Sequence, residues 1–382
     1  MGLADDIKSL AFEMGFHAVG ITSAEPFLEA ERVLRERYKR GLLEGSGYNP
    51  KDIHLYTHPH ETLPTARTII SVALSYLTDD VEEPATGAGP RGWMARFSRG
   101  LDYHQVLQER LFALAGYIQV KLGRPAAMLM LADTGPLVDR SAAIRAGVGS
   151  RGKNTCVYAG EYASWVVLGE LITDLELEPD ESAPLEICGE CNKCVEACPT
   201  GAICEPYVVD VRICLSRVTQ SKGFIPHSLR EKLGTRIYGC DTCQSACPLN
   251  ESAKPGNIKD FRPSQGLGKD PELLPLLNIS RKEFEARIGP TTAGWIGRAT
   301  FRRNVAVALG NIGDPAAVPG LVEALSDPEP VIRGHAAWAL GKIGMSPARP
   351  AIENALARET DEQVVGEIRE ALDKGAAMPP RG

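Results

Sequence analysis

The stretch Cys188-Gly-Glu-Cys191-Asn-Lys-Cys194-Val-Glu-Ala-Cys198-Pro199 carries four cysteines in a C-x2-C-x2-C-x3-C-P pattern. This is the spacing of bacterial ferredoxins that hold two iron–sulfur clusters, where three thiolates bind one cluster and the fourth reaches the other. A second group, Cys214, Cys240, Cys243 and Cys247, is interrupted by an insertion at residues 215–239 and again ends in a Cys-Pro pair. The pattern predicts two 4Fe-4S clusters. We assign Cys188, Cys191, Cys194 and Cys247 to one cluster, and Cys198, Cys214, Cys240 and Cys243 to the other.

Zinc binding and disulfide bonds are the alternative uses of these cysteines. Zinc is satisfied by two C-x2-C pairs, which leaves the third cysteine and both Cys-Pro pairs without a role. Disulfides need an oxidising compartment, and residues 1–25 lack the basic and apolar regions of a secretory signal. We therefore expect a cytoplasmic protein with reduced cysteines. Cys156 and Cys204 lie outside the pattern and are expected to be buried or half-buried thiols.

Length and charge limit the remaining possibilities. A chain of 382 residues with 43% hydrophobic content has room for two or three domains with proper cores. No apolar run reaches the roughly 18 residues that a membrane span requires. The net charge of -7 argues against general affinity for nucleic acid. Residues 281–303 are the exception, with six basic and two acidic residues, although such a run can also be a solvated helix face.

The C-terminal part repeats itself after 31 residues. The segment Ala308-Leu-Gly-Asn-Ile-Gly313 returns as Ala339-Leu-Gly-Lys-Ile-Gly344, and residues 318–325 return in a similar form at 349–356. Short helical repeats with a Gly-Asp-Pro turn are typical of HEAT-like solenoids, which bury their cores only by stacking on neighbours. We predict HEAT-like repeats over residues 279–375, too few to be stable alone.

The first 180 residues read as an α/β domain. Hydrophobic periodicity predicts helices at 3–15 and 103–122 and strands at 18–22, 68–76, 127–132 and 165–171. The overall fold class is therefore α+β multidomain. An N-terminal α/β domain (1–180) precedes a ferredoxin-like domain (181–256) and the all-α repeats.

Two places in the first domain have polar residues where a strand should simply end. In Leu131-Ala-Asp133-Thr-Gly-Pro-Leu, an acid closes an apolar strand before a tight turn; it is a candidate site residue or a helix N-cap. Residues 145–155 form a glycine-rich loop with three cations. Its glycines allow a backbone to approach a ligand closely, and the alternative is a flexible turn.

Together these segments resemble the epoxyqueuosine reductases over nearly the whole chain. The motifs that carry the resemblance are Leu131-Ala-Asp-Thr-Gly-Pro-Leu-Val-Asp-Arg140, Ala146-Gly-Val-Gly149, Gly152-Lys-Asn-Thr155, Leu168-Gly-Glu-Leu171, the ferredoxin run and Tyr238-Gly-Cys-Asp-Thr-Cys-Gln-Ser-Ala-Cys-Pro248. The resemblance implies cobalamin, two 4Fe-4S clusters and the last step of queuosine synthesis on the wobble base of tRNA. It also implies that residues 1–180 bind cobalamin and that the repeats contact tRNA.

The resemblance also suggests site residues. Asp133 matches the proton donor, whose pKa we expect burial to raise, whereas Arg140 should keep Asp139 charged. Asp102-Tyr103-His104 lacks the glycine of a D-x-H-x-x-G motif, so cobalamin should be base-off, without a histidine ligand. Candidate cobalamin contacts are Arg140, Ser141, Arg145, Lys153, Asn154 and Thr155. Candidate tRNA contacts are Arg281, Lys282, Arg298, Arg302 and Arg303.

Three other functions remain open from sequence alone. An electron-carrying ferredoxin leaves the first domain unexplained, and a binding module that recruits a protein leaves the clusters idle. A small-molecule reductase like the reductive dehalogenases also combines cobalamin with two clusters, but lacks basic helical repeats and commonly carries an export signal. We expect a monomer that receives electrons from a low-potential cytoplasmic donor and acts on tRNA.

Overall fold

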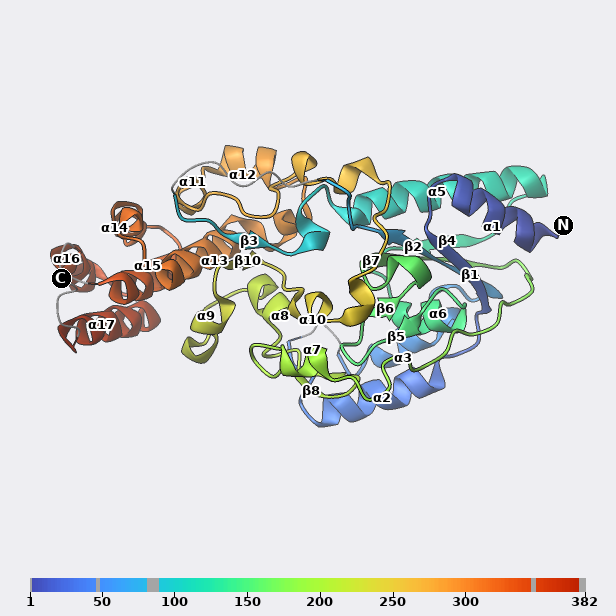
Figure 1. The fold of residues 1–382 in the computed structure, drawn as a ribbon, viewed down its shortest axis with the longest axis horizontal. Helices are drawn as coiled ribbons and strands as arrows, with labels where there is room; N and C mark the ends of the chain where they lie inside the picture. The colour runs from blue at the N-terminus through green and yellow to red at the C-terminus, as the bar shows by residue number, and fades with distance from the viewer. Residues whose placement is uncertain (1, 46–48, 81–88, 345–347, 378–382) are drawn as a thin grey trace. The chain divides into compact units, whose positions relative to one another are not determined.

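The computed structural model describes residues 2–45, 49–80, 89–344 and 348–377, which form two compact units. Unit 1 comprises residues 1–80, 101–214 and 241–262, and unit 2 comprises residues 81–100, 215–240 and 263–382. Each unit is thus assembled from segments far apart in the chain (Figure 1). The insertion between Cys214 and Cys240 belongs to unit 2, together with the helical repeats.

Unit 1 contains a four-stranded sheet, two small hairpins and eight α-helices among its described residues. Its strands are β1 (Ala18–Ser23), β2 (Thr68–Ser75), β4 (Met128–Leu131), β5 (Ser150–Arg151), β6 (Val157–Tyr158), β7 (Val166–Thr173), β8 (Ile203–Glu205) and β9 (Val208–Val209). Its α-helices are α1 (Leu3–Glu13), α2 (Leu28–Lys39), α3 (Ile53–Thr57), α4 (Pro59–Thr62), α5 (Tyr103–Leu122), α6 (Asp139–Arg145), α7 (Lys193–Glu196) and α10 (Thr242–Ser245).

The main sheet has the order β1-β2-β7-β4, and all three strand pairs are antiparallel. Helices α1 and α5 pack on one face and α6 packs on the other (Figure 1). Every residue of β2 is buried, as expected for a central strand covered on both faces. The predicted helices and strands are confirmed, but the expectation of an α/β domain is wrong, because an antiparallel sheet makes this region α+β.

The cysteine-bearing part of unit 1 is built from short elements. The hairpins β5–β6 and β8–β9 are each antiparallel. Helix α7 begins within the first cysteine run, α10 begins within the second, and the two helices pack on each other. Long elements do not form here because cysteines, glycines and prolines follow one another closely.

Unit 2 combines the insertion with the helical repeats. Its strands are β3 (Trp93–Met94) and β10 (Arg236–Tyr238). Its α-helices are α8 (Leu215–Gln220), α9 (His227–Leu233), α11 (Leu274–Leu277), α12 (Arg281–Arg287), α13 (Gly297–Ile312), α14 (Val318–Ala324), α15 (Pro330–Ile343), α16 (Arg349–Arg358) and α17 (Glu362–Ala377). The two strands form a short parallel pair.

The repeats stack as predicted, and the insertion supplies the neighbour that they need. Helix α15 packs between α13 and α17, while α13 also packs on α8, α9 and β10 of the insertion. Buried polar groups reinforce this packing: Asn304 donates to the carbonyls of Thr219 and Ile237. In the part of the chain that the structure describes, no helix combines the length and apolar character needed to span a membrane.

Candidate active site

Asp133 lies in a tight turn directly after strand β4. Its φ of 59° is in the left-handed region, where aspartate is tolerated better than most residues with a side chain. The turn is closed by hydrogen bonds from Thr134 N to the Ala132 carbonyl (2.6 Å) and from Leu137 N to the Gly135 carbonyl (2.9 Å). The Asp133 side chain is 60% exposed. The turn therefore presents a carboxylate at the surface of unit 1.

Two residues from the start of α5 hold this carboxylate. The Tyr103 hydroxyl donates to Asp133 Oδ2 at 2.6 Å, and His104 Nε2 lies 3.6 Å from the same oxygen. His104 Nδ1 lies 2.6 Å from Asp102 Oδ1, which also caps the helix by accepting from the His104 N–H. Both ring nitrogens of His104 therefore face carboxylate oxygens.

These contacts fix where the proton resides. Burial disfavours the imidazolium, but hydrogen bonds to Asp102 and Asp133 outweigh it and raise the pKa of His104 to about 9. The hydrogen bond from His104, aided by Tyr103, lowers the pKa of Asp133 against the effect of burial. For the chain by itself, the pKa of Asp133 thus shifts opposite to the rise expected for this carboxyl buried beside the corrin. Near neutral pH, Asp133 is ionised and His104 carries the proton.

A second pair of acids, the fully buried Glu170 and the partly buried Asp139, lies nearby in unit 1. Burial, then the Asp133 charge, raises the pKa of Asp139 to about 7, and burial together with Asp139 raises the pKa of Glu170 well above its usual value. Ser71 donates to Glu170 Oε1, whereas Glu170 Oε2 and Asp139 Oδ1 have no other donor. Two carboxyl groups in contact need a proton between them. The expectation that Arg140 keeps Asp139 charged is wrong, because burial outweighs its attraction.

The predicted cobalamin-contact residues fall into two groups. Arg145 donates to Thr22 Oγ1 and to the Ser23 carbonyl, and its guanidinium stacks 3.6 Å above the Phe27 ring. The Lys153 ammonium donates to Asn192 Oδ1. These side chains, like that of Asn154, which donates to the Tyr158 hydroxyl, are engaged within the protein. Arg140 is exposed and donates to Thr155 Oγ1 at 3.1 Å, and Ser141 and Thr155 are partly exposed.

The glycines of the 145–155 loop serve the protein's own packing. A Cβ at Gly149 would lie 2.4 Å from the Tyr158 carbonyl oxygen, and one at Gly152 would lie 2.4 Å from the Tyr158 ring. Either contact would force the hairpin apart. Packing against Tyr158 by itself therefore requires glycine at these two positions.

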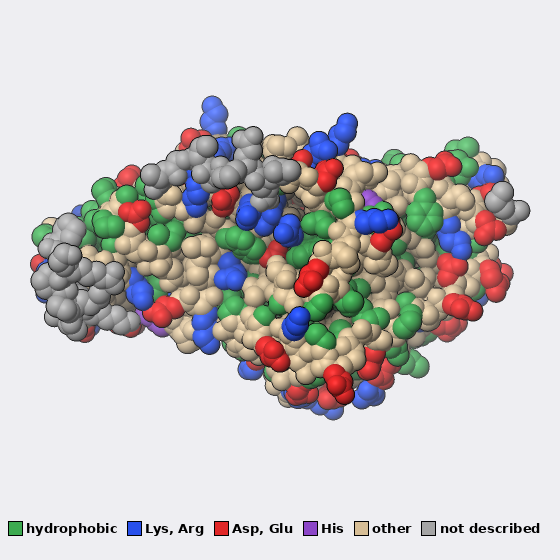
Figure 2. All heavy atoms as spheres, viewed as in Figure 1, with side chains coloured by type: hydrophobic (Ala, Val, Ile, Leu, Met, Phe, Trp, Pro, Cys, Tyr) green, Lys and Arg blue, Asp and Glu red, His purple; other side chains and the backbone are tan. Residues whose placement is uncertain are grey.

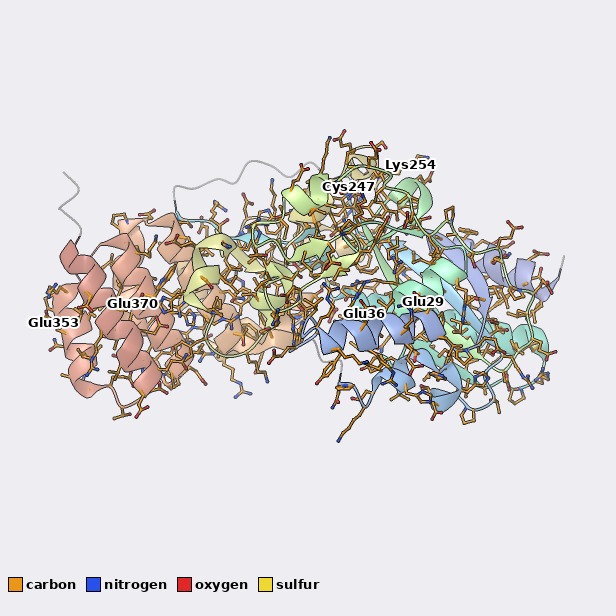
Figure 3. The ribbon with its side chains drawn as sticks, turned by 90° about the horizontal axis from the view of Figure 1, so that it is seen from below. Glu29, Glu36, Cys247, Lys254, Glu353 and Glu370 are labelled. Carbon is orange, nitrogen blue, oxygen red and sulfur yellow. The ribbon has the colours of Figure 1, made fainter. Side chains whose placement is uncertain are left out.

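All eight cysteines assigned to clusters lie among the described residues and none forms a disulfide. Backbone N–H groups donate to two of their sulfurs, from Lys153 to Cys188 Sγ (3.4 Å) and from Ala202 to Cys198 Sγ (3.2 Å). Such donors are typical of thiolates that ligate iron–sulfur clusters. Cys247, labelled in Figure 3, is buried in unit 1. Outside the pattern, Cys156 is half-buried, whereas Cys204 is exposed, contrary to expectation.

Comparison with known families gives this geometry its context. Residues 57–134 match the family described as epoxyqueuosine reductase QueG, DUF1730, residues 187–250 match a 4Fe-4S double cluster binding domain, and residues 298–373 match HEAT repeats. A Bacillus cereus epoxyqueuosine reductase is 40% identical over 374 residues, covering 97% of each chain. The chain belongs to the epoxyqueuosine reductases, a family of oxidoreductases. The Bacillus subtilis epoxyqueuosine reductase is 39% identical and covers the whole chain and 98% of that relative.

Solved epoxyqueuosine reductases have the same fold. One, crystallised with an epoxyqueuosine-modified tRNA-Tyr stem loop, has a TM-score of 0.93 at 38% identity and covers 98% of this chain and 99% of its own. The Bacillus subtilis enzyme, described with its catalytic aspartate loop swung out of the active site, has a TM-score of 0.91 at 37% identity over 97% of this chain and 98% of its own.

The basic segment 281–303 does not form one surface. Arg281, Lys282 and Arg287 of α12 are exposed, and the Arg298 guanidinium is half-buried with a bond to the Ile279 carbonyl. Arg302 and Arg303 are only 3% and 1% exposed. The predicted role of these two arginines in tRNA binding is wrong, because phosphates cannot reach guanidinium groups enclosed in unit 2.

Arg302 and Arg303 have structural partners instead. Arg302 pairs with Asp327 at 2.6 Å and donates to the Leu277 carbonyl. Arg303 donates to four backbone carbonyls of the insertion, those of Val218, Thr219, Ser221 and Gly223. Burial, then repulsion from Arg230, lowers the pKa of Arg303 to about 9. Both side chains therefore stabilise the packing of the repeats.

Sequence reasoning misses Tyr103, His104 and Glu170. In the sequence, Tyr103 and His104 stand out only as part of the incomplete D-x-H-x-x-G motif. They lie about thirty positions before Asp133, so the sequence does not indicate that they contact it. Glu170 reads as a simple strand-end acid, yet it is fully buried in β7. The sequence feature that could have identified Glu170 is the presence of a charged residue inside the apolar strand 166–173.

Proposed function

We propose that this chain reduces the epoxide of epoxyqueuosine at the wobble position of tRNA to the carbon–carbon double bond of queuosine. The reaction consumes two electrons and two protons, breaks both carbon–oxygen bonds of the epoxide and releases water. The observation that carries the proposal is the Asp133 carboxylate, held in a surface turn by Tyr103 and His104, in a chain that matches epoxyqueuosine reductases over nearly its full length. The stem loop bound by a relative supports tRNA as the substrate.

The eight cysteines are proposed to hold the two clusters in the grouping inferred from their spacing. Cysteines that form no disulfide and follow the double-cluster pattern, with N–H donors on two sulfurs, fit this role better than zinc. Two clusters accept electrons one at a time from a low-potential cytoplasmic donor and pass them on. A two-electron reduction thereby becomes compatible with one-electron donors.

Cobalamin is proposed as the cofactor of the reduction, and it supplies a low-valent cobalt that delivers electrons to the substrate. Among the predicted contact residues, Arg140, Ser141 and Thr155 retain accessible polar groups that would hold its side chains. The engagement of both His104 nitrogens fits a cofactor that takes no histidine ligand. Arg145, Lys153 and Asn154 would affect cobalamin binding only indirectly, because they stabilise the loop at residues 145–155.

Asp133 is proposed to deliver the proton that the departing oxygen needs. Because His104 holds a proton up to about pH 9 and Asp133 is ionised, the proton passes from the imidazolium through the carboxyl to the substrate oxygen. Tyr103 keeps Oδ2 in place during the transfer. The positive φ of Asp133 makes Asn the appropriate replacement, since Asn also tolerates this conformation.

The tRNA surface is proposed to include the exposed cations of α12 and Arg298. Arg281 and Lys282 would contact phosphates, and Trp295, 56% exposed between α12 and α13, offers a ring on which a base can stack. Figure 2 shows Lys and Arg side chains interspersed with Asp and Glu on the visible face, so a few placed cations, rather than a uniformly basic surface, would grip the RNA.

The test is an anaerobic turnover assay of the reconstituted enzyme with cobalamin, a strong reductant and tRNA that carries epoxyqueuosine. Product nucleosides are weighed by mass spectrometry. Loss of one oxygen that depends on added cobalamin is the expected result. Intact clusters and bound cobalamin without any oxygen loss would overturn the proposal and favour reduction of a small molecule, as in reductive dehalogenases. We also propose that the protein is cytoplasmic and monomeric; light scattering would test the monomeric state.

A further inference from the structure

Tyr158 places its hydroxyl group against one of the cysteines assigned to a cluster. It belongs to β6, is 6% exposed and donates a hydrogen bond to Cys247 Sγ at 3.1 Å. Cys247 is itself only 8% exposed. The hydrogen bond therefore lies in a region from which water is largely excluded, where an interaction with a charged sulfur is strong.

Asn154 determines which way the Tyr158 hydroxyl points. The Asn154 side chain is 4% exposed, and its Oδ1 accepts from the backbone N–H of Cys156 at 3.1 Å. That contact fixes the amide orientation, so Nδ2 faces Tyr158 and donates to its hydroxyl oxygen at 3.0 Å. Since this lone pair is taken by Asn154, the hydroxyl hydrogen is directed to the sulfur.

The same loop supplies a second donor to the same predicted cluster. The Lys153 N–H donates to Cys188 Sγ at 3.4 Å, and the Lys153 ammonium donates to Asn192 in the first cysteine run. Close packing of Gly152 against the Tyr158 ring holds the two donors in one rigid hairpin. Residues 152–158 thus form a hydrogen-bonded support for Cys188 and Cys247.

We infer that Tyr158, oriented by Asn154, is a positioning residue that raises the reduction potential of the cluster held by Cys188, Cys191, Cys194 and Cys247. The inference rests on the proposed cluster ligands. On reduction this cluster accepts one electron from the external reductant, and no bond or proton is exchanged. A hydrogen bond to a ligating sulfur stabilises the more negative, reduced form, which shifts the potential upward.

The test is anaerobic redox potentiometry of reconstituted wild-type protein and Tyr158→Phe, with the reduced clusters followed by EPR. Phe retains the ring and removes the donor. At a fixed potential the variant should show a threefold lower ratio of reduced to oxidised cluster, equivalent to about 28 mV at 59 mV per decade for a one-electron couple. Only one of the two cluster steps should move. Tyr162→Phe is the matched control, because Tyr162 packs against His17, and both of its cluster steps should stay unchanged.

Each other result has a definite meaning. Intact clusters with unchanged potentials in Tyr158→Phe would overturn the inference while leaving the proposed reductase function standing. A wild-type protein that binds no 4Fe-4S cluster would overturn the ligand assignment and the inference with it. If Tyr158→Phe fails to hold its cluster, Asn154→Asp decides: its carboxylate should accept the hydroxyl hydrogen away from Cys247 and lower the same potential, and an unchanged potential would contradict the inference.

Discussion

The acids around Asp133 in unit 1 and the arginines inside unit 2 are both unusual ionisable groups, but they differ in whether their polar atoms find hydrogen-bond partners. Arg303 is buried and donates to four backbone carbonyls. Asp139 and Glu170 each leave an oxygen without a donor, so they must retain a proton. The difference teaches that burial alone does not mark a functional charge. A satisfied buried charge stabilises the fold, whereas an incompletely satisfied one changes its protonation and can serve chemistry.

Removing the arginine should give the largest effect on stability. Arg303→Met removes the donor from four carbonyls of the insertion, of which those of Val218 and Thr219 are buried, and should lower the free energy of unfolding by about 3 kcal/mol or more. Urea unfolding followed by circular dichroism measures it. Arg281→Met is the control: its side chain is 87% exposed, so stability should hardly change. Equal midpoints for the two variants would contradict a structural role for Arg303.

The shared proton of Asp139 and Glu170 should appear as a pH dependence of stability. The unfolded chain releases the Asp139 proton near pH 4, whereas the folded protein, with Glu170 beside it, holds that proton to about pH 7. Stability should therefore fall as pH rises across this window, by up to about 1.4 kcal/mol per pH unit for one proton. Glu170→Gln supplies a permanent N–H donor and should flatten the slope in urea unfolding. An unchanged slope would show that the pair holds no extra proton.

Reversing exposed cations should weaken tRNA binding, in contrast to the buried ones. Arg281→Glu with Lys282→Glu should make the plot of log affinity against log salt shallower by about 0.7 to 0.9 for each phosphate that is no longer neutralised. Arg349→Glu is a matched control, because Arg281 and Arg349 each pair with a glutamate four residues later at 2.8 Å. Fluorescence anisotropy with a labelled stem loop measures both. If the control weakened tRNA binding equally, the result would contradict a specific contact between α12 and the RNA.

The smallest effect is expected in the pH dependence of kcat/KM when His104 is replaced. If the His104 imidazolium supplies the proton, kcat/KM should fall as pH rises through about 9, and His104→Gln should be slower and lack this limb. His60→Gln, at an exposed position of α4, should keep the wild-type profile. A limb near pH 9 that persists in His104→Gln would assign it to another group.

Elements with strong local patterns are predictable from the sequence. Helix 103–122 has the predicted bounds at both ends, and the repeats and the cysteine pattern are evident from their periods. The basic segment is not predictable, because the same residue type is exposed at Arg281 and enclosed at Arg303 by an insertion some eighty positions earlier. Likewise, the pKa of Asp133 depends on His104, which only the folded chain brings near. The order of the strands, and hence the antiparallel sheet, also cannot be predicted from the sequence.

The central claim is that Asp133 delivers the proton during epoxide reduction. Its most direct test compares wild-type enzyme, Asp133→Asn and Asp174→Asn in the anaerobic tRNA assay, at matched cluster and cobalamin content. Asp174 directly follows β7, and its Oδ1 accepts the Ala127 N–H in a structural contact, so its variant should keep most activity. Asp133→Asn should lose about 10²- to 10⁴-fold in rate while both clusters remain. Queuosine formation at the wild-type rate by Asp133→Asn would contradict the account.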